Sequence, residues 1–153
     1  MKAEYEEVWV TSMDEDPGAL GNKLASLAEA GANLETIIAR RCHEKPGTNV
    51  VFVTPLREDR EIQAAREEGF SVSCHMHSVR AEGQNEPGIA AKVAKRIGEA
   101  GLKLRGFCGT VIGSRFVLHL AFDTAADAQR AVTVLESWPS MAEQPQRTRV
   151  ECF

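Results

Sequence analysis

The chain has little of what marks membrane-spanning, secreted or nucleic-acid-binding proteins. No apolar run in its 153 residues approaches the roughly 18–20 residues that a transmembrane helix needs. Lys and Arg number 18 against 22 Asp and Glu, so the formal charge of −4 provides no basic surface for nucleic acid or an anionic membrane. The N-terminus, MKAEYEEVWV, is acidic from Glu4 onward, which is unlike a signal or transit peptide.

Cysteine is scarce and dispersed. The four cysteines (Cys42, Cys74, Cys108 and Cys152) contain no C-x-x-C pair, and they are too few for a secreted disulfide scaffold of this size. We therefore expect reduced thiols in a cytoplasmic protein. A hydrophobic content of 43% and a charged content of 26% are ordinary for a globular chain that builds one domain or two small ones.

The most informative feature that is present is an internal repeat. Pro17-Gly18 returns as Pro87-Gly88, and Glu29-Ala30-Gly31 returns as Glu99-Ala100-Gly101, both at an offset of 70 residues. Two motifs repeated at one spacing indicate a duplication. The sequence predicts two similar modules, residues 1–75 and 76–153, with function where the modules meet.

Each copy predicts the order strand, helix, strand, strand, helix, strand. In the first copy we expect strands at 7–13, 34–42 and 49–54, with helices at 17–30 and 57–68; in the second, strands at 73–81, 104–112, 115–122 and 147–152, with helices after Pro87 and Asp123. Asp16 and Pro17 suit the N-cap and the first helical position. The pattern favours an α+β fold of two ferredoxin-like βαββαβ modules side by side, with helices on one face of a roughly eight-stranded antiparallel sheet.

At this point the residues resemble a known family. The run Asp14–Leu20, followed by Leu27–Leu34, resembles the signature of the ACT domain: a D-x-P-G-x-L loop, a helix, and G-x-N-I at the second strand. The second copy, Asn85–Ile89 with Glu99–Leu104, is a weaker match. The chain therefore resembles a stand-alone tandem ACT protein. The resemblance implies a non-enzymatic regulatory protein that needs no cofactor and senses a free amino acid between its modules.

Such a ligand has a carboxylate and an ammonium group. A helix N-terminus offers backbone N–H groups and a partial positive charge to the carboxylate, and nearby oxygens suit the ammonium. The Pro-Gly loops lead into such termini, and we expect the ligand residues there and after the first helix. They are Asp14, Glu15, Asp16, Gly18, Ala19, Leu20, Asn33, Leu34, Gln84, Asn85, Glu86, Gly88, Ile89 and Ala90.

The two copies differ at equivalent positions. Glu15 corresponds to Asn85, and Asn33 corresponds to Lys103. A pseudo-two-fold pairing would place Asn85 opposite Asn33, as a neutral site for a zwitterion, and Glu15 opposite Lys103, as an ion pair. We expect one competent site and one degenerate site. The alternative is that the acidic residues only cap the first helix and that Asn33 only serves a turn.

Other functions stay open on the sequence. The modules could dimerise or dock onto a metabolic enzyme or a transcription regulator without any small ligand, and a homodimer would cover the sheet edges. A small enzyme could use Cys42 or the pair His75 and His77. We expect no catalytic site and no metal site, because Cys74 points away from that histidine pair and no third ligand lies at metal-site spacing.

Overall fold

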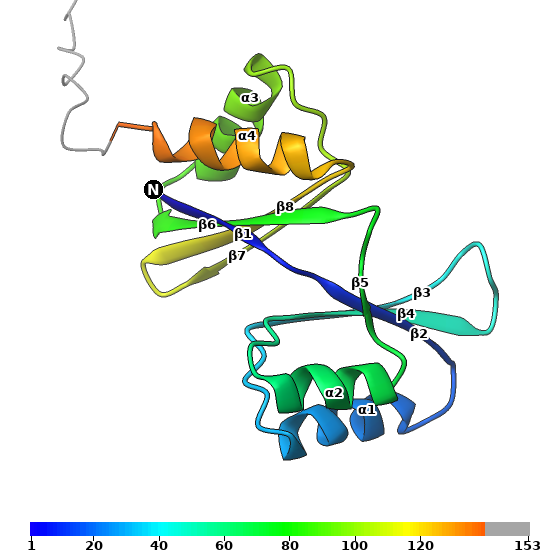
Figure 1. Cartoon of the computed structure of the whole chain (residues 1–153). Coiled ribbons are helices and arrows are strands. Elements are labelled where there is room, and N and C mark those ends of the chain that lie inside the picture. Colours follow the sequence, from blue (N-terminus) through cyan, green and yellow to red (C-terminus); the bar gives the residue numbers. More distant parts are fainter. Residues whose placement is uncertain (140–153) are drawn as a thin grey trace, which may run out of the picture.

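The repeated pattern folds into two units, each with an antiparallel four-stranded sheet and two helices (Figure 1). The computed structural model describes residues 1–139, and none of their helices is long and apolar enough to span a membrane. The first unit contains β2 (Trp9–Asp14), α1 (Ala19–Glu29), β3 (Thr36–Arg41), β4 (Thr48–Thr54), α2 (Asp59–Glu67) and β5 (Ser71–Val72). The second contains β6 (His77–Gln84), α3 (Ile89–Glu99), β7 (Gly106–Ile112), β8 (Arg115–Phe122) and α4 (Ala125–Glu136). The predicted α+β class with ferredoxin-like units is confirmed.

The second unit takes one strand from the start of the chain. Strand β1 (Lys2–Glu6) pairs antiparallel with β6, in the place that β5 occupies beside β2 in the first unit. This strand was not expected from the sequence. The module boundaries 1–75 and 76–153 stay a prediction. The strand expected at Arg147–Cys152 lies outside the described residues. Alternation explains β1, because Ala3 is buried in the core while Glu4 faces away from it.

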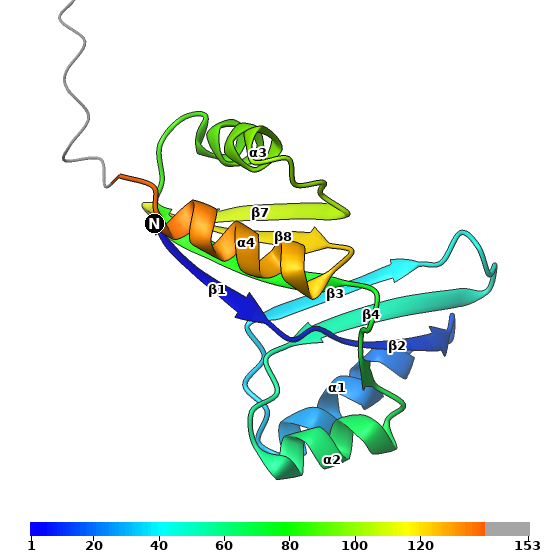
Figure 2. The ribbon, with the colours of Figure 1, turned by 45° about the horizontal axis from the view of Figure 1, so that its top comes forward.

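The two sheets stack face to face, so the expectation of one eight-stranded sheet is wrong. The strand orders are β3-β4-β2-β5 and β1-β6-β8-β7, and no ladder joins the two sheets within residues 1–139. Helices α1 and α2 cover one outer side and α3 and α4 the other (Figures 1 and 2). Two segments cross between the sheets, Glu7-Val8 and Ser73–Met76, and the Ser73 N–H donates to the Val8 carbonyl at 3.0 Å. The strand expected at 73–81 therefore begins only at His77, after this crossing.

Each unit has its own apolar core between its sheet and its helices. On β8, which is the strand expected at 115–122, the alternate residues Phe116, Leu118, Leu120 and Phe122 are buried against α3 and α4. In the first unit the core contains Trp9, Leu27, Val51, Val53, Leu56, Ala65 and Phe70. The opposite faces of both sheets are therefore left to meet each other.

The Pro-Gly pairs form turns rather than first helical residues. The Ala19 N–H donates to the Asp16 carbonyl at 3.2 Å, and Gly18 has a φ of 83° and a ψ of −11°. Proline at the second turn position and a left-handed glycine at the third are typical of a type II turn. The expected cap at Asp16 is therefore wrong, and α1 begins at Ala19. The second copy repeats this geometry, with Gly88 at a φ of 85° before α3.

We predict opposite effects of alanine at two glycines of the second unit. Gly88→Ala is expected to lower the free energy of unfolding by about 1–2 kcal/mol, because a Cβ disfavours the left-handed conformation. Gly98→Ala is expected to raise it by about 0.5–1 kcal/mol, because Gly98 lies inside α3 and nothing lies within 4 Å of the added Cβ. Urea unfolding measures both changes, and a stabilising Gly88→Ala would contradict the turn geometry.

Candidate ligand site between the two sheets

A half-open cavity of about 340 Å³ lies between the facing sheets. It is lined by Glu6, Val8, Thr36, Ile38, Arg40, Phe52, Val53, Thr54, Met76, Ser78, Arg105, Gly106, Phe107, Cys108, His119 and Ala121. Successive residues of a strand point to opposite faces of the sheet. Core residues therefore point to the helices, and the residues between them point to the cavity. On β3, Thr36 and Ile38 pair with Thr54 and Phe52 on this inner face. Volumes of this order suit small-molecule ligands.

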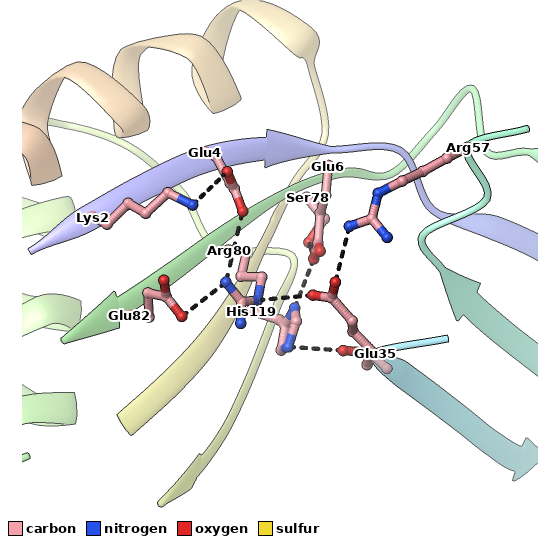
Figure 3. Close-up of polar contacts among 10 residues, drawn as sticks. Lys2, Glu4, Glu6, Glu35, Arg57, Ser78, Arg80, Glu82 and His119 are labelled. Atoms are coloured by element: carbon pink, nitrogen blue, oxygen red, sulfur yellow. Dashed lines mark hydrogen bonds and ion pairs between the residues drawn. The ribbon is translucent and has the colours of Figure 1, made fainter. Parts of the chain in front are cut away.

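A row of hydrogen bonds crosses the cavity from one sheet to the other. Glu6 Oε1 accepts from Ser78 Oγ at 2.8 Å and from His119 Nδ1 at 2.6 Å. Figure 3 shows the Ser78, Glu6 and His119 side chains of this row. On the other side of the imidazole ring, His119 Nε2 lies 3.1 Å from Thr36 Oγ1, within hydrogen-bond distance of the hydroxyl. The His119 and Glu6 side chains are only 14% and 12% exposed.

We interpret this row of hydrogen bonds as a structural contact that holds the two units together. Its order of carboxylate, imidazole and hydroxyl is also the order of hydrolase triads, which are recognised by geometry together with an oxyanion site. Here the hydroxyl belongs to a β-branched residue that begins β3, at the end of the β3–β4 ladder where Thr36 pairs with Thr54. The row therefore joins the second unit to the first through His119 and Thr36.

Two arginines lie at the rim of the cavity and differ in their partners. Arg105 donates to Asp123 Oδ1 at 2.8 Å. Arg40 has its guanidinium carbon 5.7 Å from the centre of the Phe52 ring, and no carboxylate of residues 1–139 lies within 4.0 Å of it. Arg40 is therefore the free cationic group of the rim.

A second polar network joins the units beside the cavity (Figure 3). Arg80, whose side chain is 18% exposed, contacts Glu82 at 3.0 Å, Glu4 at 3.6 Å and Glu35 at 3.8 Å. Glu35 also accepts from Arg57 Nη2 at 2.9 Å. The hydrogen bond from Arg57 lowers the pKa of Glu35 from its ordinary value of 4.5, although burial opposes it. Glu35 thus links a strand of the second unit to the loop before α2.

This lowered pKa gives a pH prediction. Because the pKa of Glu35 is lower in the folded chain than in the unfolded chain, its stabilisation is complete above pH 4.5 and is lost as the pH falls through the folded value. We expect Glu35→Gln to lower the melting temperature at pH 7 by only about one or two degrees, because the pair is exposed, and the difference to vanish in strong acid. Calorimetric scans at several pH values test this; a difference that grows in acid would contradict it.

The structure keeps the two predicted ligand loops apart, each beside a hairpin of its own unit. The Glu15 N–H donates to the Gly47 carbonyl at 3.1 Å, and the Asn85 N–H donates to the Ser114 carbonyl at 2.8 Å. The Glu15 carboxylate lies 3.5 Å from Arg41 rather than opposite Lys103, so that expected ion pair is wrong. The two sheets stack face to face instead of pairing edge to edge, and the expected ion pair between Glu15 and Lys103 depended on edge-to-edge pairing.

The remaining predicted ligand residues are distributed along the same two segments. Asp14 ends β2 and Gln84 ends β6, while Ala19, Leu20, Ile89 and Ala90 begin the helices. Glu86 forms an ion pair with Lys92. Leu34, which follows Asn33 in the sequence, packs against the core of the first unit. No hydrogen bond joins Asn33 to Asn85 in the described part of the chain. A ligand role for these fourteen residues stays a prediction.

The histidine pair does not form a shared site. His77 opens β6 and its Nδ1 lies 2.9 Å from the Tyr5 hydroxyl, while His75 precedes the strand in a bend. No group of three His, Cys, Asp or Glu side chains in residues 1–139 has the geometry to hold a metal ion. The pairing of His119 with Glu6 was not expected from the sequence; the alternation of Ala3, Glu4, Tyr5 and Glu6 was the available signal.

Comparison with known proteins identifies the fold. No family model and no curated protein matches the sequence. Protein BT0572 from Bacteroides thetaiotaomicron matches with a TM-score of 0.71 at 14% identity, over 86% of this chain and 88% of that one. The aspartokinase alpha and beta subunits give 0.59 at 18% identity, over 89% and 95% of the two chains. The ligand-free regulatory subunit of aspartate kinase from Thermus thermophilus gives 0.56 at 15% identity, over 87% and 94%. The predicted resemblance to tandem ACT proteins is confirmed at the level of the fold.

Proposed function

We propose that the chain is a non-enzymatic regulatory module that binds a free amino acid at the interface of its two units. The observation that carries the proposal is the cavity between the sheets, where apolar walls surround a few convergent polar groups. The similarity in fold to a protein described as a regulatory subunit supports the regulatory role. A cytoplasmic amino-acid pool would supply the ligand.

The two predicted loops are the competing location for the same ligand. They offer helix N-termini, but Glu15 and Glu86 already pair with Arg41 and Lys92. The cavity offers an unpaired arginine and a shielded carboxylate. We therefore place the ligand in the cavity.

Thermal shift against the twenty amino acids is the first test. A ligand that binds only the folded chain raises its stability by RT ln(1 + [L]/Kd), so a few amino acids at millimolar concentration should raise the melting temperature and the others should not. A flat response to all twenty would refute the proposal.

A second candidate function is self-association, with or without a docked enzyme or regulator. Within residues 1–139, strand β7 pairs only with β8, and every one of its residues is exposed. Three of its large apolar side chains are exposed to solvent: Phe107 is 41% exposed, Val111 is 52% exposed and Ile112 is 71% exposed. An apolar edge of this kind favours pairing with another strand, and we propose a homodimer through β7 of two copies.

We predict that one charge on this edge separates the copies. Val111→Lys is expected to yield monomers in sedimentation velocity at micromolar concentration, because two lysines would meet across the paired edges. Val72→Lys on β5, an edge strand of the other sheet, is the matched control and should stay dimeric; Val72 is 41% exposed. A monomeric unsubstituted chain, or a dimer lost equally in both variants, would contradict a β7 interface.

A further inference from the structure

We propose that the cavity selects an α-amino acid with an apolar side chain, with its carboxylate on Arg40 and its ammonium group on Glu6. This inference rests on the proposed function and adds the chemical class of the ligand and the two residues that orient it.

Arg40 is suited to the carboxylate. It lies on the inner face of β3, its guanidinium carbon is 5.7 Å from the centre of the Phe52 ring, and no carboxylate of the described chain lies within 4.0 Å of it. A planar guanidinium binds a carboxylate with two parallel hydrogen bonds, and a nearby aromatic face attracts the cation. Arg105, the other rim arginine, already donates to Asp123.

Glu6 is suited to the ammonium group. Its Oε1 accepts from both Ser78 and His119, whereas its Oε2 has no hydrogen-bond or ion-pair partner in residues 1–139. The side chain is only 12% exposed, so an ammonium group bound there is largely shielded from water. The two existing bonds hold the carboxylate in one orientation before the ligand arrives.

The rest of the lining disfavours a polar side chain. The inward walls are Val8, Ile38, Phe52, Met76 and Ala121. Three of the polar groups already bond to one another, since His119 contacts Thr36 and Glu6 through its two ring nitrogens and Ser78 donates to Glu6. A charged side chain in the cavity would therefore lose its water without gaining a partner, which is costly.

Calorimetric titration of the full chain tests the class of ligand. Leucine, methionine and phenylalanine are expected to bind at least about tenfold more tightly than aspartate, lysine or serine. Leucinamide and N-acetylleucine, which lack the carboxylate charge and the ammonium charge, should each bind about ten- to a hundredfold more weakly than leucine.

Matched variants test the two contacts. Arg40→Gln should weaken leucine binding about ten- to a hundredfold and leave leucinamide binding unchanged, whereas Arg105→Gln should have little effect on either. Glu6→Gln should weaken leucine by a similar factor and leave N-acetylleucine unchanged, with Glu4→Gln as its control. Melting temperatures of all four variants separate lost contacts from lost folding.

The outcomes distinguish this inference from the proposed function. Aspartate or lysine binding as tightly as leucine, with Ala121→Phe still abolishing binding, would overturn the apolar class and retain the site. Equal sensitivity to Arg40→Gln and Arg105→Gln would overturn the assignment of the carboxylate. No binding by any amino acid would overturn both proposals.

Discussion

Ala121→Phe is expected to abolish amino-acid binding, raising the dissociation constant more than about a hundredfold. Ala121 lies on the inner face of β8 beside the Glu6–Ser78–His119 row, and it pairs across the ladders with Ser78 and Gly106. A phenyl ring there would take up much of the cavity of about 340 Å³ that the ligand needs. Because the ring enters existing space, the substitution should lower the free energy of unfolding by less than the roughly 1–3 kcal/mol that overpacking a filled core costs. Calorimetric titration with the amino acid that gives the largest thermal shift measures the effect.

Val117→Phe is the control for this substitution. Val117 is on the same strand and the same face, two pairs along from His119, but it does not line the cavity. It should bind the ligand as the unsubstituted chain does. Equal binding by Ala121→Phe and the unsubstituted chain would mean that the ligand lies elsewhere.

Ala3→Asp is expected to lower the free energy of unfolding of the second unit by about 3–5 kcal/mol, because it leaves an unpaired charge in a core. Ala3 is 3% exposed and packs with Val79 and Ala81 against the helices of that unit. Hydrogen exchange should show the loss of protection in β6 and β8 and not in β2 and β4, because β1 belongs to the second sheet.

Lys2→Asp is the control, since Lys2 is exposed on the same strand. It should change the stability by no more than about 0.5 kcal/mol. If Ala3→Asp were as mild, or if protection were lost in the first unit instead, the placement of β1 in the second sheet would be contradicted.

Much of the architecture could be predicted because it depends on local patterns. The strand expected at 115–122 is β8, and the helices expected at 17–30 and 57–68 are α1 and α2, with their bounds shifted by a few residues. The Pro-Gly motif was located correctly, but its conformation was not, since proline suits both a helix start and a type II turn. The short strand β1 was missed because five residues rich in glutamate have little β-propensity.

The candidate site depends on a long-range choice that local patterns do not determine. Alternation shows that Val117, His119 and Ala121 share a face, but not whether that face meets solvent, a second copy or the other sheet. Edge pairing would have joined the Pro-Gly loops to the neighbouring unit. Stacking joins His119 to Thr36 instead, across 83 positions of sequence.

The most direct test of the central claim is a methyl and amide NMR titration of the full chain with the bound amino acid. The proposed site predicts the largest shift changes at Ile38, Met76 and Ala121, with intermolecular nuclear Overhauser effects from the ligand side chain to the Ile38 and Met76 methyl groups. Gly18 and Gly88 in the two turns should change little. Changes concentrated at those turns, with Ile38 and Met76 unaffected, would contradict a ligand site between the sheets.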